Sequence, residues 1–495
     1  MSNTLLKQRE AGILLHPTSL PGGIGNGDLG PDAYYFVQFL VDCGLSVWQT
    51  LPLCPTHGDR SPYNGASAYA GNPLLIAASG LQQQGWVTDN EVQTAANHSD
   101  PDQGRLGLLT AAWRGFQRIG SPADKEALAL FGQQQAHWLE DYGLYQAIRE
   151  QQGELPWFSW PLPLRNREPR ALGQARRALG ERIAQVKFEQ FVFFHQWKAL
   201  RSHANSRGIR IFGDMPLFVA HDSADVWSCP HYFQLDTAGQ PTAVAGVPPD
   251  YFAEKGQRWG NPLYNWQRLE AEGFRWWIQR LQGQLALFDY VRIDHFRGLE
   301  SHWAIPAKED DPRTGRWVVT PGDALFAALR EGIGELPLIA EDLGDITPAV
   351  EALRCRQQLP GMKVMQFGFS GDPSNPHLLH QHQQQAVVYT GTHDNDTTVG
   401  WFATLPSEVA ESVRDYLGYP QEPMPWPLIR SALSSVARLA ILPLQDVLEL
   451  GGEHRMNLPG VQGGNWRWRF TWNQVREDLA LRLTRLVRLY GRWRV

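Results

Sequence analysis

The feature that most constrains the fold is a series of short apolar runs, most of them followed by a helical pattern. Eight such runs occupy residues 11–20, 46–53, 209–219, 288–294, 337–344, 362–369, 386–396 and 439–444. Strand-like runs that alternate with helices predict βα units and a parallel sheet. Eight of them favour an α/β protein built as a (β/α)8 TIM barrel, with large helical and loop insertions between barrel strands, over an open doubly wound sheet.

The length and the spacing of these runs predict the domain organisation. A chain of 495 residues exceeds the size at which a single core usually stops growing. We expect a single catalytic barrel over residues 1–495, with an inserted subdomain at about 55–208 after the second strand. We expect a second insertion, at about 220–273 after the third strand, to serve as a substrate loop, because long ordered loops at a barrel mouth are usually functional.

Composition and charge exclude several classes of partner. A hydrophobic content of 43% and a charged content of 19% are typical of a globular protein. The formal charge of −6 leaves no basic excess for nucleic acid. No run approaches the ~18 apolar residues of a membrane span, and the N-terminus lacks the apolar core of a signal peptide. Four separated cysteines without a CxxC pair fit a reducing compartment. We therefore expect a cytoplasmic protein without nucleic-acid or membrane partners.

One motif points to a dinucleotide site, but its context does not support that interpretation. Residues 25–30 fit GxGxxG after a strand. However, Pro31 follows directly, and the next strand runs into Cys54 and Pro55 without the expected ribose-binding acid. The segment is interpreted as a loop-rich turn.

Acidic residues recur at the C-terminal ends of the predicted strands. Asp214, Asp294, Glu341 and Asp394 each occupy such a position, and these ends carry the chemistry of a (β/α)8 barrel. His295 and His393 stand beside two of the acids. Any one acid alone is more often structural, but four that converge on one mouth favour a catalytic site.

Paired carboxylates at one site suit glycosyl transfer, where one acts as a nucleophile and the other as a general acid. Alternation along a strand puts Arg292 on the same face as Asp294, so we expect a lowered pKa and an ionised carboxylate at Asp294. Glu341 follows an apolar stretch and stands near other carboxylates. We expect a raised pKa there, which suits an acid/base.

A metal-dependent hydrolase is the rival use of His and Asp at a barrel mouth. Such sites need three or more ligands, often beginning with His-x-His on the first strand, where this chain offers only His16. The other candidate histidines stand next to acids and are not spaced to share a metal. The residues therefore argue against a metal site.

Several segments resemble one family. Gly213-Asp214-Met215-Pro216, residues 291–298 (VRIDHFRG), 340–344 (AEDLG) and 392–396 (THDND) resemble the four signature segments of the amylomaltases. These are 4-α-glucanotransferases, a disproportionating-enzyme family of the α-amylase clan. Residues 246–252, 256–262 and 455–460 resemble that family specifically. The match runs from about residue 12 to 468, and it departs from the family pattern at residues 64–66 and 461–463.

The resemblance implies a reaction, the residues that carry it and independence from a metal or any other cofactor. The reaction is retaining transfer of a 1,4-α-glucan segment to the 4-hydroxyl of an acceptor glucose or glucan through a covalent glucosyl-enzyme, which disproportionates maltooligosaccharides. Asp294 would be the nucleophile, Glu341 the acid/base and Asp394 the residue that stabilises the transition state. The substrate-binding residues would be Tyr63, Asp214, Tyr251, Phe252, Trp259, Arg292, His295, His393 and Asn457.

Two alternatives stay open at this point. One is an α-glucan hydrolase on the same barrel, because the preference for transfer over hydrolysis follows mainly from the resemblance. The other is a catalytically silent glucan-binding protein, against which the presence of all three acids argues.

Overall fold

Eight parallel strands form one sheet in the computed structural model, which describes residues 6–249, 255–461 and 463–493. Their spatial order is β10-β11-β12-β1-β2-β3-β6-β9. Strands that follow one another in this sheet therefore pair, β12 pairs with β1, and β9 and β10 are its two outer strands. The strands are β1 (Glu10–Leu14), β2 (Val47–Gln49), β3 (Arg210–Met215), β6 (Tyr290–Ile293), β9 (Leu338–Ala340), β10 (Gly361–Val364), β11 (Ala386–Tyr389) and β12 (Leu439–Pro443).

The seam between β9 and β10 brings the two outer strands of this sheet together. The Ala340 N–H donates to the Pro360 carbonyl at 2.9 Å. The Asp342 carboxylate accepts from the Met362 N–H at 2.6 Å and lies 3.2 Å from Arg354 Nε. The eight parallel strands therefore form a nearly closed barrel, and the predicted (β/α)8 fold is confirmed.

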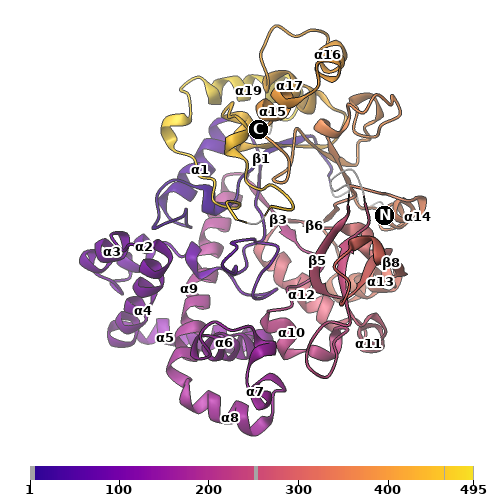
Figure 1. The fold of residues 1–495 in the computed structure, drawn as a ribbon. Helices are drawn as coiled ribbons and strands as arrows, with labels where there is room; N and C mark the ends of the chain where they lie inside the picture. Colours follow the sequence, from indigo (N-terminus) through magenta and orange to yellow (C-terminus); the bar gives the residue numbers. More distant parts are fainter. Residues whose placement is uncertain (1–5, 250–254, 462, 494–495) are drawn as a thin grey trace.

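Helices surround the barrel and fill its connections (Figure 1). Between β1 and β3 lie α1 (Pro31–Asp42), α2 (Ala78–Gln83), α3 (Asp89–Ala96), α4 (Pro101–Ile119), α5 (Pro122–Gln134), α6 (Ala136–Gln151), α7 (Leu162–Arg165), α8 (Pro169–Ala178) and α9 (Gly180–Ser206). Further along come α10 (Ala224–Ser228), α11 (Trp266–Ala271), α12 (Arg275–Leu287), α13 (Gly322–Ile333) and α14 (Pro348–Arg356). The last are α15 (Thr398–Thr404), α16 (Ser407–Tyr416), α17 (Trp426–Ser434), α18 (Leu444–Val447) and α19 (Leu479–Leu489).

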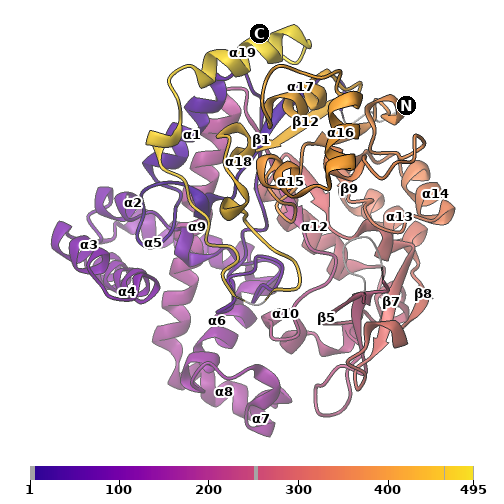
Figure 2. The same cartoon turned by 45° about the horizontal axis from the view of Figure 1, so that its top comes forward.

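A second, antiparallel sheet has the order β5-β4-β7-β8. It consists of β4 (Ala243–Val247), β5 (Gln257–Pro262), β7 (Ser301–Pro306) and β8 (Arg316–Val319). Figure 2 shows it on the opposite side of the molecule from α2 to α4. Its strands come from the connections after β3 and after β6. The division of the chain into a barrel and two insertions, at about 55–208 and 220–273, stays a prediction.

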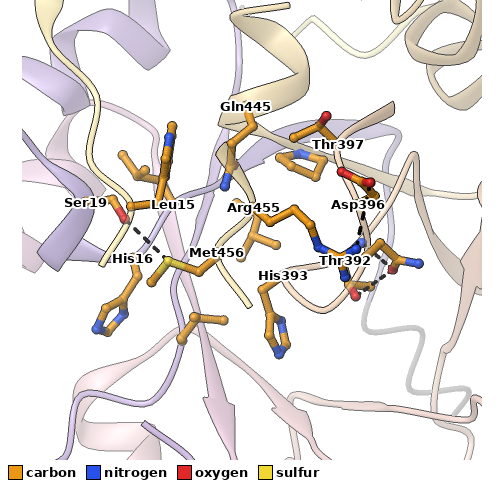
Figure 3. Close-up of a pocket in the computed structure, with 15 residues that line it drawn as sticks. Leu15, His16, Ser19, Thr392, His393, Asp396, Thr397, Gln445, Arg455 and Met456 are labelled. Carbon is orange, nitrogen blue, oxygen red and sulfur yellow. Dashed lines mark hydrogen bonds and ion pairs between the residues drawn. The ribbon is translucent and has the colours of Figure 1, made fainter. Parts of the chain in front are cut away.

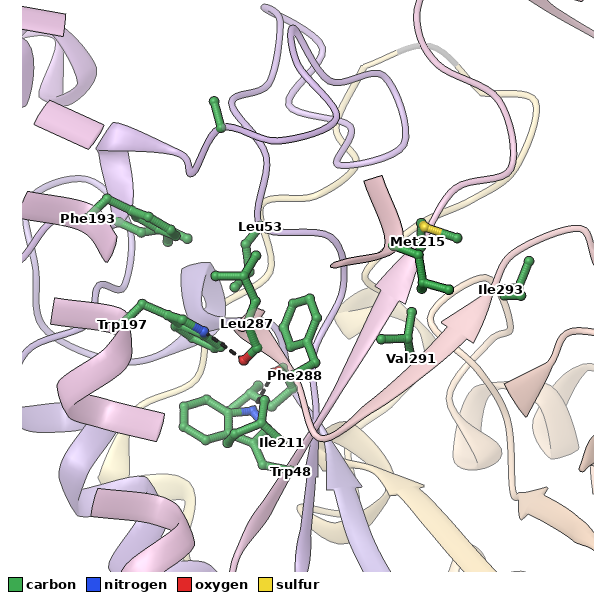
Figure 4. Close-up of a cluster of buried hydrophobic side chains, with 14 of the residues drawn as sticks. Trp48, Leu53, Phe193, Trp197, Ile211, Met215, Leu287, Phe288, Val291 and Ile293 are labelled. Carbon is green, nitrogen blue, oxygen red and sulfur yellow. Dashed lines mark hydrogen bonds between the residues drawn. The ribbon is translucent and has the colours of Figure 1, made fainter. Parts of the chain in front are cut away.

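Tryptophan side chains pack the region between the barrel and α9 (Figure 4). The indole N–H of Trp197 donates to the Leu287 carbonyl at 3.0 Å, and that of Trp48 donates to the Leu15 carbonyl at 2.8 Å. Both rings are buried with their polar atom paired, so burial carries no desolvation penalty there. Close packing also explains Gly213, where an added Cβ would lie 2.1 Å from the ring of Phe288.

Apolar side chains that point inward from the strands fill the barrel interior. Each of the eight strands contributes at least one, and together they form one buried cluster: Leu14, Val47, Phe212, Tyr290, Ile339, Met362, Val364, Val387, Tyr389, Leu439 and Ile441. Two residues further along three of these strands the same face becomes polar, at Asp214, Arg292 and Glu341. Because side chains alternate along a strand, these three also point inward, above the apolar layer.

Candidate active site

Arg292 links two of the acids at the barrel mouth. Its Nη1 lies 2.7 Å from Asp214 Oδ2 and 2.9 Å from Asp294 Oδ1. Asp214 and Arg292 are register partners on β3 and β6, and Asp294 follows two residues after Arg292. The prediction that Arg292 and Asp294 share a face is confirmed. Burial opposes the charge of Arg292, but the two carboxylates raise its pKa far above the usual range.

The pKa of Asp294 differs from the prediction. Burial raises it to about 6, against the lowering influence of Arg292, and the negative charges of Asp214 and Asp394 add to the rise. The expected lowering was wrong because it considered only the nearby cation, whereas burial and the charges of Asp214 and Asp394 together outweigh Arg292. Because this pKa lies below 7, Asp294 is mostly ionised at pH 7. Its side chain is 28% exposed.

Glu341 has a raised pKa, as predicted. Burial and the charge of Asp294 raise it to about 8, although Arg292 opposes the shift. Two backbone N–H groups donate to its carboxyl, that of His295 at 2.6 Å and that of Leu343 at 3.0 Å. His295 has a left-handed backbone with φ 52°, a conformation that His adopts more readily than most residues. Glu341 is thus held in place and protonated at neutral pH.

Asp394 has the opposite protonation behaviour. Its Oδ1 accepts from Asn457 Nδ2 at 2.6 Å, and its Oδ2 lies 3.3 Å from His393 Nε2. Burial alone would raise its pKa, but His393, Asn457 and Arg292 lower it to about 2. This carboxylate is therefore negative across the physiological range.

Arg455 fixes the loops that carry Asp394 and Asn457. Its Nη2 donates to the Asp394 carbonyl at 2.9 Å, and its Nε donates to the Asn457 carbonyl at 3.2 Å. Figure 3 shows Arg455 reaching toward Asp396, whose Oδ2 lies 3.8 Å from Nη1. The sequence analysis placed Arg455 in a family-specific segment but gave it no role. Its partners are backbone carbonyls, which every residue has, so no pattern of residue types could indicate them.

Tyr63 covers one side of the site. Its hydroxyl donates to Asp214 Oδ2 at 2.8 Å, and its ring stacks on His393 with centroids 5.2 Å apart and planes 15° from parallel. Burial and the charge of Asp214 raise the pKa of Tyr63, so the phenol keeps its proton. A flat aromatic surface therefore lies next to the acids.

One groove, open to solvent, connects most of the predicted residues. Its lining includes Tyr63, Trp259, Arg292, Asp294, His295, Glu341, Asp394 and Asn457. Trp259 meets His295 edge-on, with ring centroids 4.7 Å apart. Asp214 and His393 do not line the groove but contact residues that do. Tyr251 and Phe252 lie outside the described residues.

No cluster of metal ligands accompanies the acids. Within the described ranges, no three His, Cys, Asp or Glu side chains are grouped so that they could hold a metal ion. Likewise, no helix in this part of the chain is long and apolar enough to cross a membrane. Independence from a cofactor stays a prediction.

The barrel and the paired carboxyl groups at its mouth define an enzyme that acts on glycosidic bonds. The model of the 4-alpha-glucanotransferase family matches residues 15–474, and the chain belongs to this family. The predicted family and its 4-α-glucanotransferase activity are confirmed.

Individual relatives agree over nearly the whole chain. A 4-alpha-glucanotransferase of Thermus thermophilus is 51% identical to this chain, and the match covers 96% of this chain and 97% of the relative. One of Synechocystis is 46% identical and covers 99% of both chains. Among solved structures, the amylomaltase from Streptococcus agalactiae in complex with acarbose is 36% identical. It superposes with a TM-score of 0.95 over 98% of this chain and 100% of that one.

Proposed function

We propose that Asp294, Glu341 and Asp394 carry out a retaining 4-α-glucanotransfer on maltooligosaccharides and other 1,4-α-glucans. The observation that carries the proposal is the difference between two neighbouring carboxyl groups. The pKa of Asp294 is about 6 and that of Glu341 is about 8. Between these values one group is ionised and the other protonated, which is the pairing that a nucleophile and a general acid require.

In the first half of the reaction the Asp294 carboxylate attacks C1 of a donor sugar. The bond between C1 and the leaving O4 breaks, an ester forms between the sugar and Asp294, and Glu341 gives its proton to O4. Arg292, 2.9 Å from Asp294 Oδ1, orients the nucleophile. The two backbone N–H groups on Glu341 hold the acid in place.

In the second half Glu341 acts as a base. As a carboxylate it takes the proton from the 4-hydroxyl of an acceptor glucose or glucan, and the acceptor oxygen attacks C1. The ester bond to Asp294 breaks and the nucleophile is restored. Two displacements at C1 return the original α-configuration.

Asp394 supports both transition states. Each develops positive charge at C1 and the ring oxygen, and a fixed carboxylate in a partly desolvated site stabilises such charge. The hydrogen bond from Asn457 keeps Asp394 ionised and oriented. Tyr63, Asp214 and His393 would hold the sugar at the cleavage point, and Trp259 and His295 would contact the next unit. We expect the reaction to run in the cytoplasm.

Incubation with maltotriose tests the activity. Products are resolved by length while total reducing ends are counted. Transfer predicts glucose and a ladder of longer maltooligosaccharides at a constant reducing-end count. A rising count with only glucose and maltose would mean that water is the acceptor, and the protein would be a hydrolase. No change in either measure would favour a glucan-binding protein.

A further inference from the structure

Exposed tryptophans are confined to the groove. All twenty tryptophans lie in the described part of the chain, and of these only Trp259 and Trp317 are exposed, at 37% and 36%. Both line the groove. Single exposed apolar residues need no explanation, but two exposed indoles that line one groove are suited to bind the apolar faces of a ligand. Trp259 has an expected role, whereas Trp317 has none.

Trp317 is held rigidly without a ligand. It lies on β8, an outer strand of the small sheet, and pairs in register with Trp303, whose ring centroid lies 5.0 Å away at 63°. The guanidinium of Arg297 lies 3.6 Å from the Trp317 ring centroid. An aromatic ring fixed in this way loses little conformational entropy when it binds a partner.

Polar groups suited to sugar hydroxyls surround this ring. Arg297 donates to the Asp345 backbone carbonyl and lies 3.2 Å from Asp345 Oδ2. The Asp345 side chain is 65% exposed, so its carboxylate has free acceptor capacity. Both residues line the groove. An apolar ring flanked by fixed donors and acceptors is the usual composition of a site for a small polar ligand.

The position of the acid indicates which side of the groove this is. A general acid must lie on the side of the leaving group, which is also where the acceptor binds. Leu343, Gly344 and Asp345, which come two to four residues after Glu341, line the groove. This step rests on the proposed function, because it takes Glu341 as the acid.

We propose that Trp317, Arg297 and Asp345, here called the Trp317 platform, bind a glucose unit of the acceptor beyond the unit whose 4-hydroxyl reacts. The indole face that Arg297 leaves uncovered packs against the apolar face of the sugar ring, and the exposed Asp345 carboxylate accepts hydrogen bonds from its hydroxyls. Arg297 holds the indole and Asp345 in place. Glucose as acceptor has only the reacting unit and cannot reach the platform. Longer acceptors gain from it, so the platform sets a preference for oligosaccharide acceptors.

Competition between acceptors tests the platform. Amylose serves as the unlabelled donor, and ¹³C-labelled glucose, maltose and maltotriose serve as acceptors whose elongation is followed by mass spectrometry. Trp317→Ala lowers kcat/KM for maltotriose relative to glucose about tenfold, equivalent to about 1.4 kcal/mol. Trp317→Phe retains most of the preference, because it keeps an aromatic face, and it guards against misfolding of the alanine variant.

A neighbouring residue supplies the matched control. Val319 lies on the same strand and is 77% exposed but does not line the groove, so Val319→Ala keeps the wild-type acceptor preference. An unchanged preference in Trp317→Ala, or an equal loss with every acceptor, overturns the platform. Absence of label incorporation by the wild-type protein instead overturns the proposed function, and the platform with it.

Discussion

Asn457 Nδ2 lies 2.6 Å from Asp394 Oδ1, and this hydrogen bond joins the loop after β12 to the turn after β11. The same two residues also meet through Arg455, which donates to the backbone carbonyl of each. One guanidinium therefore fixes both ends of the hydrogen bond that holds the Asp394 carboxylate. Arg455 does not line the groove and acts as a positioning residue.

Arg455→Ala should lower kcat on maltotriose by about 100-fold while KM changes little, because displacement of a catalytic group by about 1 Å costs that much. Arg455→Lys should not recover full activity, since an ammonium lacks the planar fork that reaches both carbonyls. Steady-state kinetics measure both effects.

The control for Arg455 is Arg467, an exposed arginine twelve residues further along the chain. Arg467→Ala should behave as wild type. Near-normal turnover in Arg455→Ala would show that Asn457 and Asp394 hold their positions unaided. A large loss of thermal stability in Arg455→Ala, with kcat reduced in proportion to the folded fraction, would indicate a purely structural role.

Asp294→Asn should lower turnover by several orders of magnitude and leave glucan binding intact. The amide keeps the shape of the carboxyl and removes the nucleophile. Its neighbour Arg292 retains the Asp214 carboxylate as a partner at 2.7 Å, so the site should not collapse. Calorimetric titration with maltotriose and product analysis test the two parts. Near-normal turnover in this variant would mean that another group is the nucleophile.

The pH dependence of kcat/KM should be bell-shaped. As pH falls through about 6, Asp294 takes up a proton and stops being a nucleophile. As pH rises through about 8, Glu341 loses the proton that it must give to O4. Because the two carboxyl groups interact, the limbs report the pair and not either residue alone.

A donor whose leaving group needs no proton separates the two limbs. With α-maltosyl fluoride the initial release of fluoride should lose its alkaline limb and keep its acid limb, because only Asp294 is then required. The pre-steady-state burst of fluoride measures this step. If the alkaline limb persists with α-maltosyl fluoride, a group other than Glu341 causes that limb.

Strand alternation explains why the acids could be placed from the sequence. Asp214 and Glu341 each stand two residues beyond an apolar residue of the barrel interior, and Asp294 stands two residues beyond Arg292. A period of two fixes the direction of each side chain wherever the strand is regular. Convergence of strand ends in a barrel then brings these side chains together, and no further information is needed.

Properties that depend on several distant segments could not be predicted. The pKa of Asp294 depends chiefly on its burial, which the residue types around it in the sequence do not show. Arg455 acts through backbone carbonyls, and Trp317 reaches the groove from a β-hairpin whose pairing no local pattern reveals.

Extensive dialysis against EDTA should leave transfer activity unchanged. The proposed steps use only carboxyl groups, and the positive charge beside Asp294 comes from Arg292 at 2.9 Å. Disproportionation of maltotriose before and after dialysis measures the effect. A loss of activity that only an added metal ion restores would contradict the mechanism and favour a metal-dependent hydrolase.

Gly361→Ala should destabilise the barrel at its β9–β10 seam. An added Cβ at Gly361 would lie 2.2 Å from Asp342 Oδ2. The Asp342 carboxylate cannot easily move, because it accepts from the Met362 N–H at 2.6 Å and lies 3.2 Å from Arg354 Nε. Overpacking of this kind costs about 1–3 kcal/mol of unfolding free energy. Urea denaturation measures the loss.

Gly107 in α4 provides the comparison, since an added Cβ there meets nothing within 4 Å. Gly107→Ala should be neutral or stabilise the protein by up to about 1 kcal/mol, because alanine favours the helix. Asp342 directly follows Glu341, so Gly361→Ala should also reduce kcat beyond its effect on the folded fraction. Equal stability of the two variants would show that the seam yields at little cost, and that the Asp342 carboxylate does not hold β10 against β9.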